Sequence, residues 1–126
     1  DSARHLISDK LFFTLSRNPV IFDLWDTPTW KPGHIEISQL ARLMVIAPCT
    51  ANFLGKYANG IADDALTTSA MAYEGEVLLA PAMNTRMWRN PAVQHNCETL
   101  RARGIHFVGP NAGRLACGCS VEGLMA

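Results

Sequence analysis

The sequence predicts an open α/β fold, in which helices cover both faces of a parallel sheet in three layers. Three short apolar runs, residues 43–47, 77–79 and 105–108, alternate with segments that have the spacing of helices. The first run is apolar at every position, which is typical of a parallel strand buried on both faces. Strands that alternate with helices in this way form parallel sheets with right-handed crossovers.

Composition limits the domain count and the classes of partner. The 126 residues are 48% hydrophobic and 17% charged, so we expect one globular domain over residues 1–126. The 11 basic and 11 acidic residues cancel, which argues against a nucleic-acid partner. No apolar run approaches the ~20 residues that cross a bilayer, and the first residues lack the form of a signal peptide. We therefore expect a cytoplasmic protein with no membrane partner.

The first third of the chain has weaker signals. Residues 2–16 have helical spacing of apolar side chains, with a possible restart at Ser8 and Asp9, so they predict one helix or two short ones. Residues 20–22 (VIF) are a candidate strand, and residues 26–33 must be a loop because they contain two prolines and a glycine. An amphipathic helix is then expected to begin at His34.

The remaining elements have clearer boundaries. The strand over residues 43–47 ends at Pro48, and a helix follows through Tyr57. Residues 63–72 predict a second helix with acidic residues at its start, which are expected to cap it and not to act in catalysis. A third helix is expected over residues 91–103, with a proline in its first turn.

Polar loops leave the carboxyl ends of all three predicted strands, after Ala47, Ala80 and Val108. In open α/β sheets this edge is where ligands bind. The second loop, residues 81–88 (PAMNTRMW), places Asn84 among two methionines and a tryptophan, a setting that can recognise a polar ligand group. Two structural alternatives remain: the apolar residues only fill the core, or Asn84 forms an Asx turn.

The cysteines are too few for a disulfide framework. Cys117 and Cys119 form a C-x-C pair without the second pair that structural zinc needs, so we expect no metal site. Cys49 and Cys97 are interpreted as packing residues, and Cys119 has no assigned role. Cys117 lies in a stretch flanked by glycines, typical of a flap, although a buried packing role is the alternative.

Four strings together point to a family: residues 47–52 (APCTAN), 58–64 (ANGIADD), 81–88 and 115–118 (LACG). They resemble the flavin-dependent cysteine decarboxylases, which have a Rossmann-like (flavodoxin-like) fold, and in particular the phosphopantothenoylcysteine decarboxylases of coenzyme A biosynthesis. The string at 81–88 is highly specific, whereas LACG is weak alone. His34 also falls where that family has its active-site histidine.

The resemblance implies roles for particular residues. It implies FMN as cofactor, held by Ser2, by the loop of Thr50, Ala51, Asn52 and Phe53, and by the backbone near Ala82. It implies that Asn84 binds the substrate carboxylate, and that Met87, Ala116 and Cys117 contact the substrate. It further implies a homotrimer or a dodecamer of trimers, with phosphopantothenoylcysteine as the small-molecule substrate. The family's N-terminal strand, loop and helix have no counterpart in these residues.

The chemistry explains why a flavin is needed. Loss of CO2 from a cysteine carboxylate leaves an unstabilised carbanion, whereas prior two-electron oxidation to a thioaldehyde provides an electron sink. His34 is the expected base or orienting group, with an exposed helix-entry histidine as the alternative. Cys117 is the expected acid for the final reduction. Two other functions remain: decarboxylation of C-terminal cysteines in peptides to an ene-thiol, or a non-catalytic flavoprotein subunit that regulates another protein.

Overall fold

The computed structural model describes residues 7–23, 41–114 and 120–125. The elements in chain order are α1 (Asp9–Ser16), β1 (Leu43–Cys49), α3 (Ala51–Ala58), α4 (Ala65–Ala72), β2 (Glu76–Pro81), α5 (Thr85–Trp88), α6 (Pro91–Ala102), β3 (His106–Phe107), β4 (Asn111–Arg114) and β5 (Ser120–Met125). The expected loop at 26–33 and most of the helix expected from His34 lie outside the described residues.

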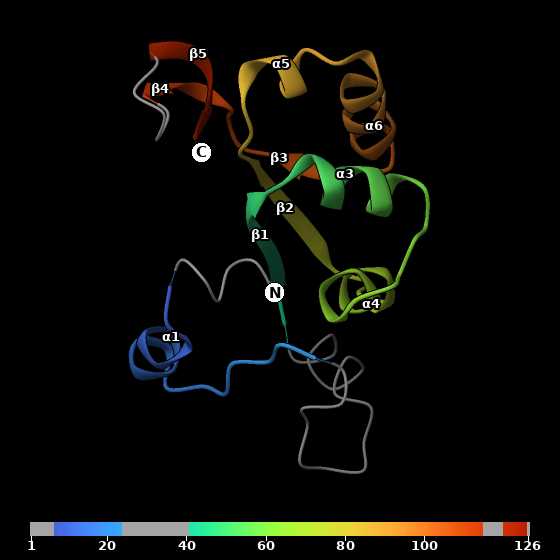
Figure 1. The fold of residues 1–126 in the computed structure, drawn as a ribbon. Coiled ribbons are helices and arrows are strands. Elements are labelled where there is room, and N and C mark those ends of the chain that lie inside the picture. Colours follow the sequence, from blue (N-terminus) through green and yellow to red (C-terminus); the bar gives the residue numbers. More distant parts are fainter. Residues whose placement is uncertain (1–6, 24–40, 115–119, 126) are drawn as a thin grey trace.

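Strands β1, β2 and β3 form a parallel sheet in that order (Figure 1). Val45 pairs with Leu78, and Leu79 pairs with Phe107. Helices α3 and α4 connect β1 to β2, while α5 and α6 connect β2 to β3. The predicted open α/β fold, with a flavodoxin-like parallel sheet, is confirmed.

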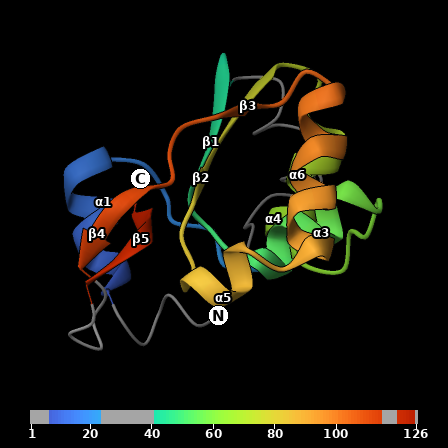
Figure 2. The ribbon, with the colours of Figure 1, turned by 90° about the horizontal axis from the view of Figure 1, so that it is seen from above.

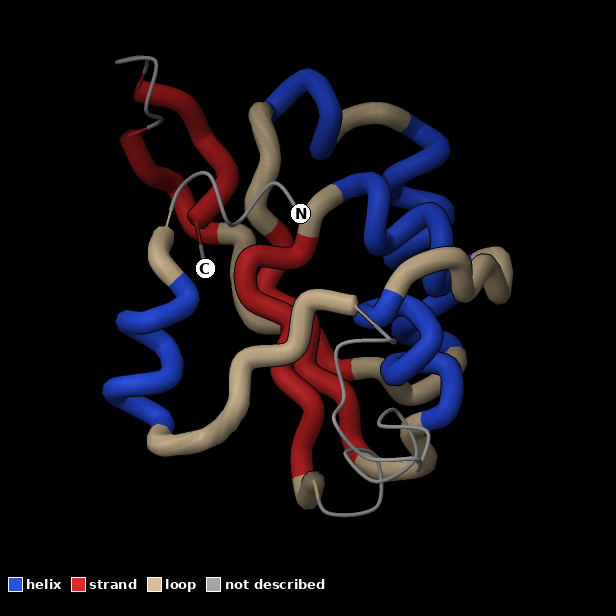
Figure 3. The backbone as a smooth tube through the Cα atoms, turned by 60° about the horizontal axis from the view of Figure 1, so that its bottom comes forward, coloured by secondary structure: helices blue, strands red, loops and turns tan. Residues whose placement is uncertain are grey.

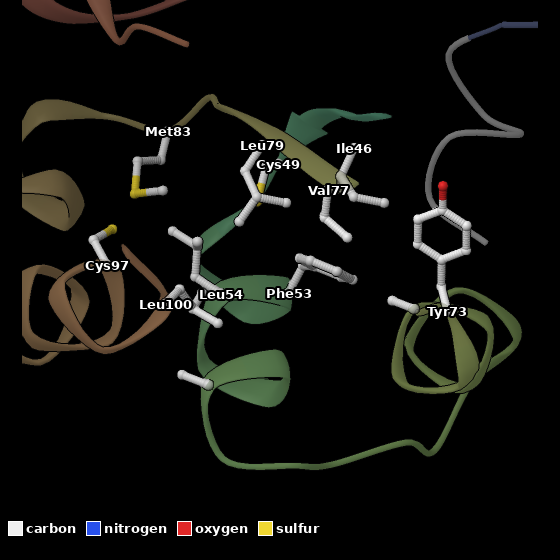
Figure 4. Packing of buried hydrophobic residues seen from close by; sticks show 12 residues of the cluster. Ile46, Cys49, Phe53, Leu54, Tyr73, Val77, Leu79, Met83, Cys97 and Leu100 are labelled. Carbon is white, nitrogen blue, oxygen red and sulfur yellow. The ribbon is translucent and has the colours of Figure 1, made fainter. Parts of the chain in front are cut away.

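The core lies between the sheet and helices α3, α4 and α6, and these three helices all lie on one face of the sheet (Figure 2). Val77 and Leu79 of β2 point into this core and are 2% and 0% exposed. Figure 4 shows these strand residues facing Phe53 and Leu54 of α3. Burial of these apolar side chains is the main force that holds the helices on the sheet.

The outer face of β1 carries apolar side chains that are exposed. Leu43 is 46% and Val45 52% exposed, so the described part of the chain does not meet the expectation that both faces of this strand are buried. Helix α1 lies on that side of the sheet (Figures 2 and 3) but buries none of its residues. The apolar run therefore predicted the strand correctly, and within the described residues Leu43 and Val45 on its outer face are exposed.

Strand β1 continues through Pro48 to Cys49, two residues beyond the predicted end. The pairing with β2 shifts between Ile46 and Cys49, and the Ala47–Pro48 peptide bond is cis. A proline cannot donate to the ladder, and it is tolerated at such an irregularity. The shift also changes the alternation of side chains, so Ile46 and Cys49, three residues apart, both lie in the core.

Other boundaries also differ from the expectations. The helix expected from Ser2 is described only from Asp9, where Ser8 caps it, which confirms the restart. Residues 20–22 form no strand. The helices at 65–72 and 91–102 are confirmed, and Asp64 forms a capping box with Thr67 at the start of the first. In the described ranges no helix is long and apolar enough to span a membrane.

Candidate functional site

Hydrogen bonds join the loops at the carboxyl edge of the sheet. The N–H of Ala82, just after β2, donates to the carbonyl of Cys49 at the end of β1, over 2.9 Å. The N–H of Val108, just after β3, donates to the carbonyl of Leu79, also over 2.9 Å. The predicted gathering of the three loops at one edge is therefore confirmed.

The loop after β1 leads directly into helix α3. Thr50 is the N-cap, and its Oγ1 accepts a 3.3 Å hydrogen bond from the N–H of Phe53. Thr50 and Asn52 are exposed and Ala51 is half-buried, whereas the side chain of Phe53 is only 4% exposed and packs in the core. This loop therefore offers a hydroxyl and an amide to a ligand, next to the positive end of a helix dipole.

The loop after β2 directs the side chain of Asn84. Asn84 is exposed and caps α5: its Oδ1 accepts a 2.9 Å hydrogen bond from the N–H of Met87. Because a main-chain N–H can only donate, the atom that faces it must be the carbonyl oxygen. The amide NH2 of Asn84 is then left as a donor, and among the described residues it has no hydrogen-bond partner.

The three apolar side chains around Asn84 differ in burial. Met83 is 9% exposed and belongs to the core, and Trp88 packs against that core (Figure 4 labels Met83). Met87 is 45% exposed. The structural alternative thus holds for Met83 and Trp88, while Met87 remains available to a ligand. Similarly, Asn84 caps a helix with its oxygen and has an NH2 group that no described residue bonds, so the two interpretations of this residue are compatible.

Strands β4 and β5 form an antiparallel hairpin, and its strand β5 lies against α5 and β2. Ala116 and Cys117 lie in sequence between β4 and β5. Ala116, Cys117, Ser2 and His34 themselves lie outside the described residues. The structure therefore brings together the loop at Thr50, Ala82 and Asn84, while the other predicted site residues stay predictions.

The two described cysteines have the properties of packing residues. Both are fully buried and free. Burial, together with the neighbouring Cys97, raises the pKa of Cys49 to about 12, and burial raises the pKa of Cys97 as well. Both thiols therefore remain protonated near neutral pH, where a thiol that acts as a nucleophile must ionise. Their predicted role in packing is confirmed.

Sequence reasoning did not single out Gln94, whose amide nitrogen lies 2.5 Å from the carbonyl oxygen of Trp88. Its position on α6 has no periodic or motif signal that would have identified it, because the contact depends on where α5 ends. The short helix α5 and the hairpin of β4 and β5 were also not predicted. One helical turn and two glycine-containing strands are too short for hydrophobic periodicity to show.

The fold is that of the open-sheet α/β proteins, a class that binds ligands beyond the carboxyl ends of its parallel strands. The chain belongs to the Flavoprotein family, whose model matches residues 1–126. This confirms the family that the four strings indicated.

Several relatives support this membership. The coenzyme A biosynthesis bifunctional protein CoaBC of Bacillus subtilis (strain 168) is 43% identical over 119 residues, which cover 94% of this chain and 29% of that protein. The FMN-dependent cysteine decarboxylase SpaF has 39% identity and a TM-score of 0.80 over 84% of this chain and 61% of that one. A PPC decarboxylase variant complexed with pantothenoylaminoethenethiol has 36% identity and a TM-score of 0.78, and the match covers 86% of this chain and 63% of that one. The chain thus spans less than a third of the length of the Bacillus subtilis CoaBC protein.

Proposed function

We propose that this chain belongs to an FMN-dependent carboxy-lyase that converts phosphopantothenoylcysteine to phosphopantetheine and CO2 in coenzyme A biosynthesis. The observation that carries the proposal is the Asn84 side chain, which is oriented by its cap and whose NH2 group has no hydrogen-bond partner among the described residues. Family membership and the similarity to CoaBC and to PPC decarboxylase support it.

The residues at this edge fit a flavin. Thr50 and Asn52 supply exposed polar groups at the N-terminus of an eight-residue helix, which favours the anionic or carbonyl-rich parts of FMN. The backbone at Ala82 lies against the same loop through its hydrogen bond to Cys49, so one ligand can contact both. Met87 adds exposed apolar surface suited to a flat ring. Ser2 is proposed as a further FMN contact.

Asn84 suits a carboxylate that has to leave as CO2. Its neutral NH2 group can donate to a carboxylate oxygen, and it is fixed by the bond to Met87 before substrate arrives. A cationic side chain in this place would hold the charged ground state more tightly and so oppose its loss. We assign Asn84 to binding and orienting the carboxylate, with Met87 and Ala116 beside the substrate.

When bound, FMN supplies the two-electron oxidation of the cysteine Cα–Cβ–SH unit and the return of those electrons. His34 takes or orients the proton of the substrate thiol or carboxylate in this proposal. Cys117 donates the proton that completes the saturated product. The role of Cys117 rests on the resemblance in the string at 115–118, and the role of His34 rests on its position where the family has its active-site histidine.

A second candidate is decarboxylation of a cysteine at the end of a peptide, with the ene-thiol as product. The similarity to the peptidyl-cysteine decarboxylase EpiD, with 29% identity and a TM-score of 0.74, supports it, as the similarity to PPC decarboxylase supports the first candidate. The resemblance implies that relatives of the peptide type lack the cysteine of the A-C-G string, whereas this chain has Cys117. That residue decides our preference for the saturated product.

The proposal includes assembly into a homotrimer, or a dodecamer of trimers. Helix α1 supports it because four large apolar side chains are exposed there, namely Leu11 51%, Phe12 51%, Phe13 56% and Leu15 74%. Several large apolar side chains exposed on one helix are typical of a protein interface. Light scattering coupled to size exclusion would test the assembly, and a monomer at micromolar concentration would contradict it.

The test is to give the flavin-loaded protein either phosphopantothenoylcysteine or a peptide that ends in cysteine. CO2 release and product mass are followed for both. The proposal predicts CO2 and saturated product from the first substrate. Ene-thiol product from the peptide alone would favour the second candidate, and no CO2 from either substrate would contradict both.

A further inference from the structure

The side chain of Gln94 connects helix α6 to the end of α5. Its Nε2 donates a partly buried 2.5 Å hydrogen bond to the main-chain carbonyl oxygen of Trp88. Because a carbonyl can only accept, the amide nitrogen must be the atom that faces it. Trp88 is the last residue of α5, where a helix leaves its carbonyl groups without partners inside the helix. Gln94 satisfies one of these carbonyl groups from a different element.

Helix α5 is a single turn of four residues, which is too short to be stable by itself. At its start, Oδ1 of Asn84 accepts the N–H of Met87 over 2.9 Å. At its end, Gln94 holds the carbonyl of Trp88. The N–H of Trp88 also donates to the main-chain carbonyl of Asn84 over 3.0 Å, so the two ends are directly linked. A displacement of Trp88 must therefore displace Asn84.

Gln94 is presented from a rigid element. It lies in the first turns of the twelve-residue helix α6, and its own N–H donates to the carbonyl of Asn90 over 3.1 Å. The side chain of Asn90 caps the same helix by accepting the N–H of Ala92 over 2.9 Å. Helix α6 in turn packs on the core through Cys97 and Leu100, which are 0% and 1% exposed. The amide of Gln94 is thus a fixed point against which α5 is held.

We propose that Gln94 is a positioning residue: through α5 it sets the direction of the Asn84 NH2 group and hence the affinity for the substrate carboxylate. This rests on the proposed function of Asn84. Gln94 does not touch the substrate, so it acts on substrate affinity only through the turn that it holds. Misplacement of a binding group by about 1 Å can cost on the order of 100-fold in rate.

The first comparison is between Gln94→Met, which keeps the side-chain length but cannot donate, and His95→Met, an exposed neighbour on the same helix. The predicted result for Gln94→Met is a loss in kcat/KM of roughly 10- to 100-fold, mostly through KM. For His95→Met, kcat and KM both stay at the wild-type values. An unchanged KM in Gln94→Met would overturn the proposal.

Gln94→Glu adds a pH dependence of kcat/KM that a loss of packing alone would not produce. An ionised carboxylate cannot donate to the Trp88 carbonyl, whereas the protonated acid can. The ratio of kcat/KM between this variant and wild type should therefore rise as pH falls toward the ordinary glutamate pKa of about 4.3. The same ratio for Gln94→Met should stay flat. Taking the ratio removes the pH dependence that the variant and wild type share. The charged side chains on or beside α6 and its neighbours α5 and α3 are Arg86, Arg89, His95, Glu98, Arg101 and Lys56.

Hydrogen exchange tests whether Gln94 holds α5, and it needs no turnover of substrate. The amides of Met87 and Trp88 are expected to exchange faster in Gln94→Met than in wild type, with the later amides of α6 unchanged. Equal exchange at α5 in both proteins would overturn the role of Gln94, whatever the activity. A wild-type protein that turns over no cysteine substrate would instead overturn the proposed function and the link to the carboxylate, while the exchange data still decide whether Gln94 holds α5.

Discussion

The side-chain oxygen of Asn84 accepts the main-chain N–H of Met87 over 2.9 Å, so this side chain caps α5 with one atom and leaves the other for a ligand. The cap uses Oδ1, and the proposed contact with the substrate uses Nδ2. Stability and binding therefore depend on different atoms of one residue. Substitutions can separate the two because aspartate keeps the acceptor and removes the donor.

Asn84→Ala is expected to lower the free energy of unfolding by about 1 kcal/mol, the usual cost of losing an N-cap. Asn84→Asp is expected to stay close to wild type, since a carboxylate caps a helix as well as an amide does. Urea unfolding of the three proteins at neutral pH measures the difference. Equal destabilisation by both substitutions would mean that the cap does not contribute to stability.

The cap of α4 predicts a dependence of stability on pH. Burial raises the pKa of Asp64, but hydrogen bonds from Thr67 and the Lys56 ammonium outweigh it, so the pKa lies below its usual value. A lowered pKa stabilises the fold above the unfolded-state value of about 3.9, and this contribution is lost as pH falls through the folded-state value.

Asp64→Ala should therefore lower the free energy of unfolding by about 1 kcal/mol near neutral pH, and by less in strong acid. Asp64→Asn is the matched control because it keeps the cap acceptor and loses only the charge. Thermal unfolding across the acid range distinguishes the three proteins. A constant difference between Asp64→Ala and wild type at every pH would contradict the assignment.

The buried thiols should resist alkylation. With the pKa of Cys49 raised to about 12 and both side chains fully buried, iodoacetamide at about pH 8 should leave Cys49 and Cys97 unmodified in the native protein. The same peptides should be modified after denaturation, which serves as the control. Peptide mass spectrometry reads both states. Rapid labelling of Cys97 in the native protein would show that the α6 interface opens readily.

Cys117→Ser separates the two halves of the proposed reaction. CO2 should still be released in the first turnover, because the carboxylate contact and the oxidation do not involve this thiol, whereas further turnovers need dissolved O2 to reoxidise the reduced FMN. The final reduction should stall, because a serine hydroxyl is a far weaker acid than a thiol, so the ene-thiol accumulates. Product mass is the readout. Saturated product formed at the wild-type rate would remove Cys117 from the mechanism.

Local rules predicted much of this fold because the relevant signals are short in range. The apolar runs located β1, β2 and β3, and capping residues such as Asp64 located helix starts. The bulge in β1 was not predictable, because the shift between Ile46 and Cys49 is defined by pairing with β2 and not by β1 alone. Residues 20–22 have strand composition but no pairing partner among the described strands, so composition misled there.

The site was predictable only in part. Loop positions after parallel strands indicated that Thr50 and Asn84 would lie at one edge, and the hydrogen bond from Ala82 to Cys49 connects those loops. Only the structure showed which of residues 81–88 are buried in the core and which are exposed to a ligand. Met83 and Met87 are equivalent in sequence terms, yet one is buried at 9% exposure and the other is 45% exposed, since α5 turns the chain between them.

The most direct test of the role of Asn84 is CO2 release from phosphopantothenoylcysteine by wild-type protein and by Asn84→Asp, each loaded with equal FMN. Wild type should release CO2 steadily. Asn84→Asp should lose at least about 100-fold in rate, because a carboxylate repels the substrate carboxylate where an amide donated to it. Equal rates from the two proteins would contradict the assignment of Asn84 to the substrate carboxylate.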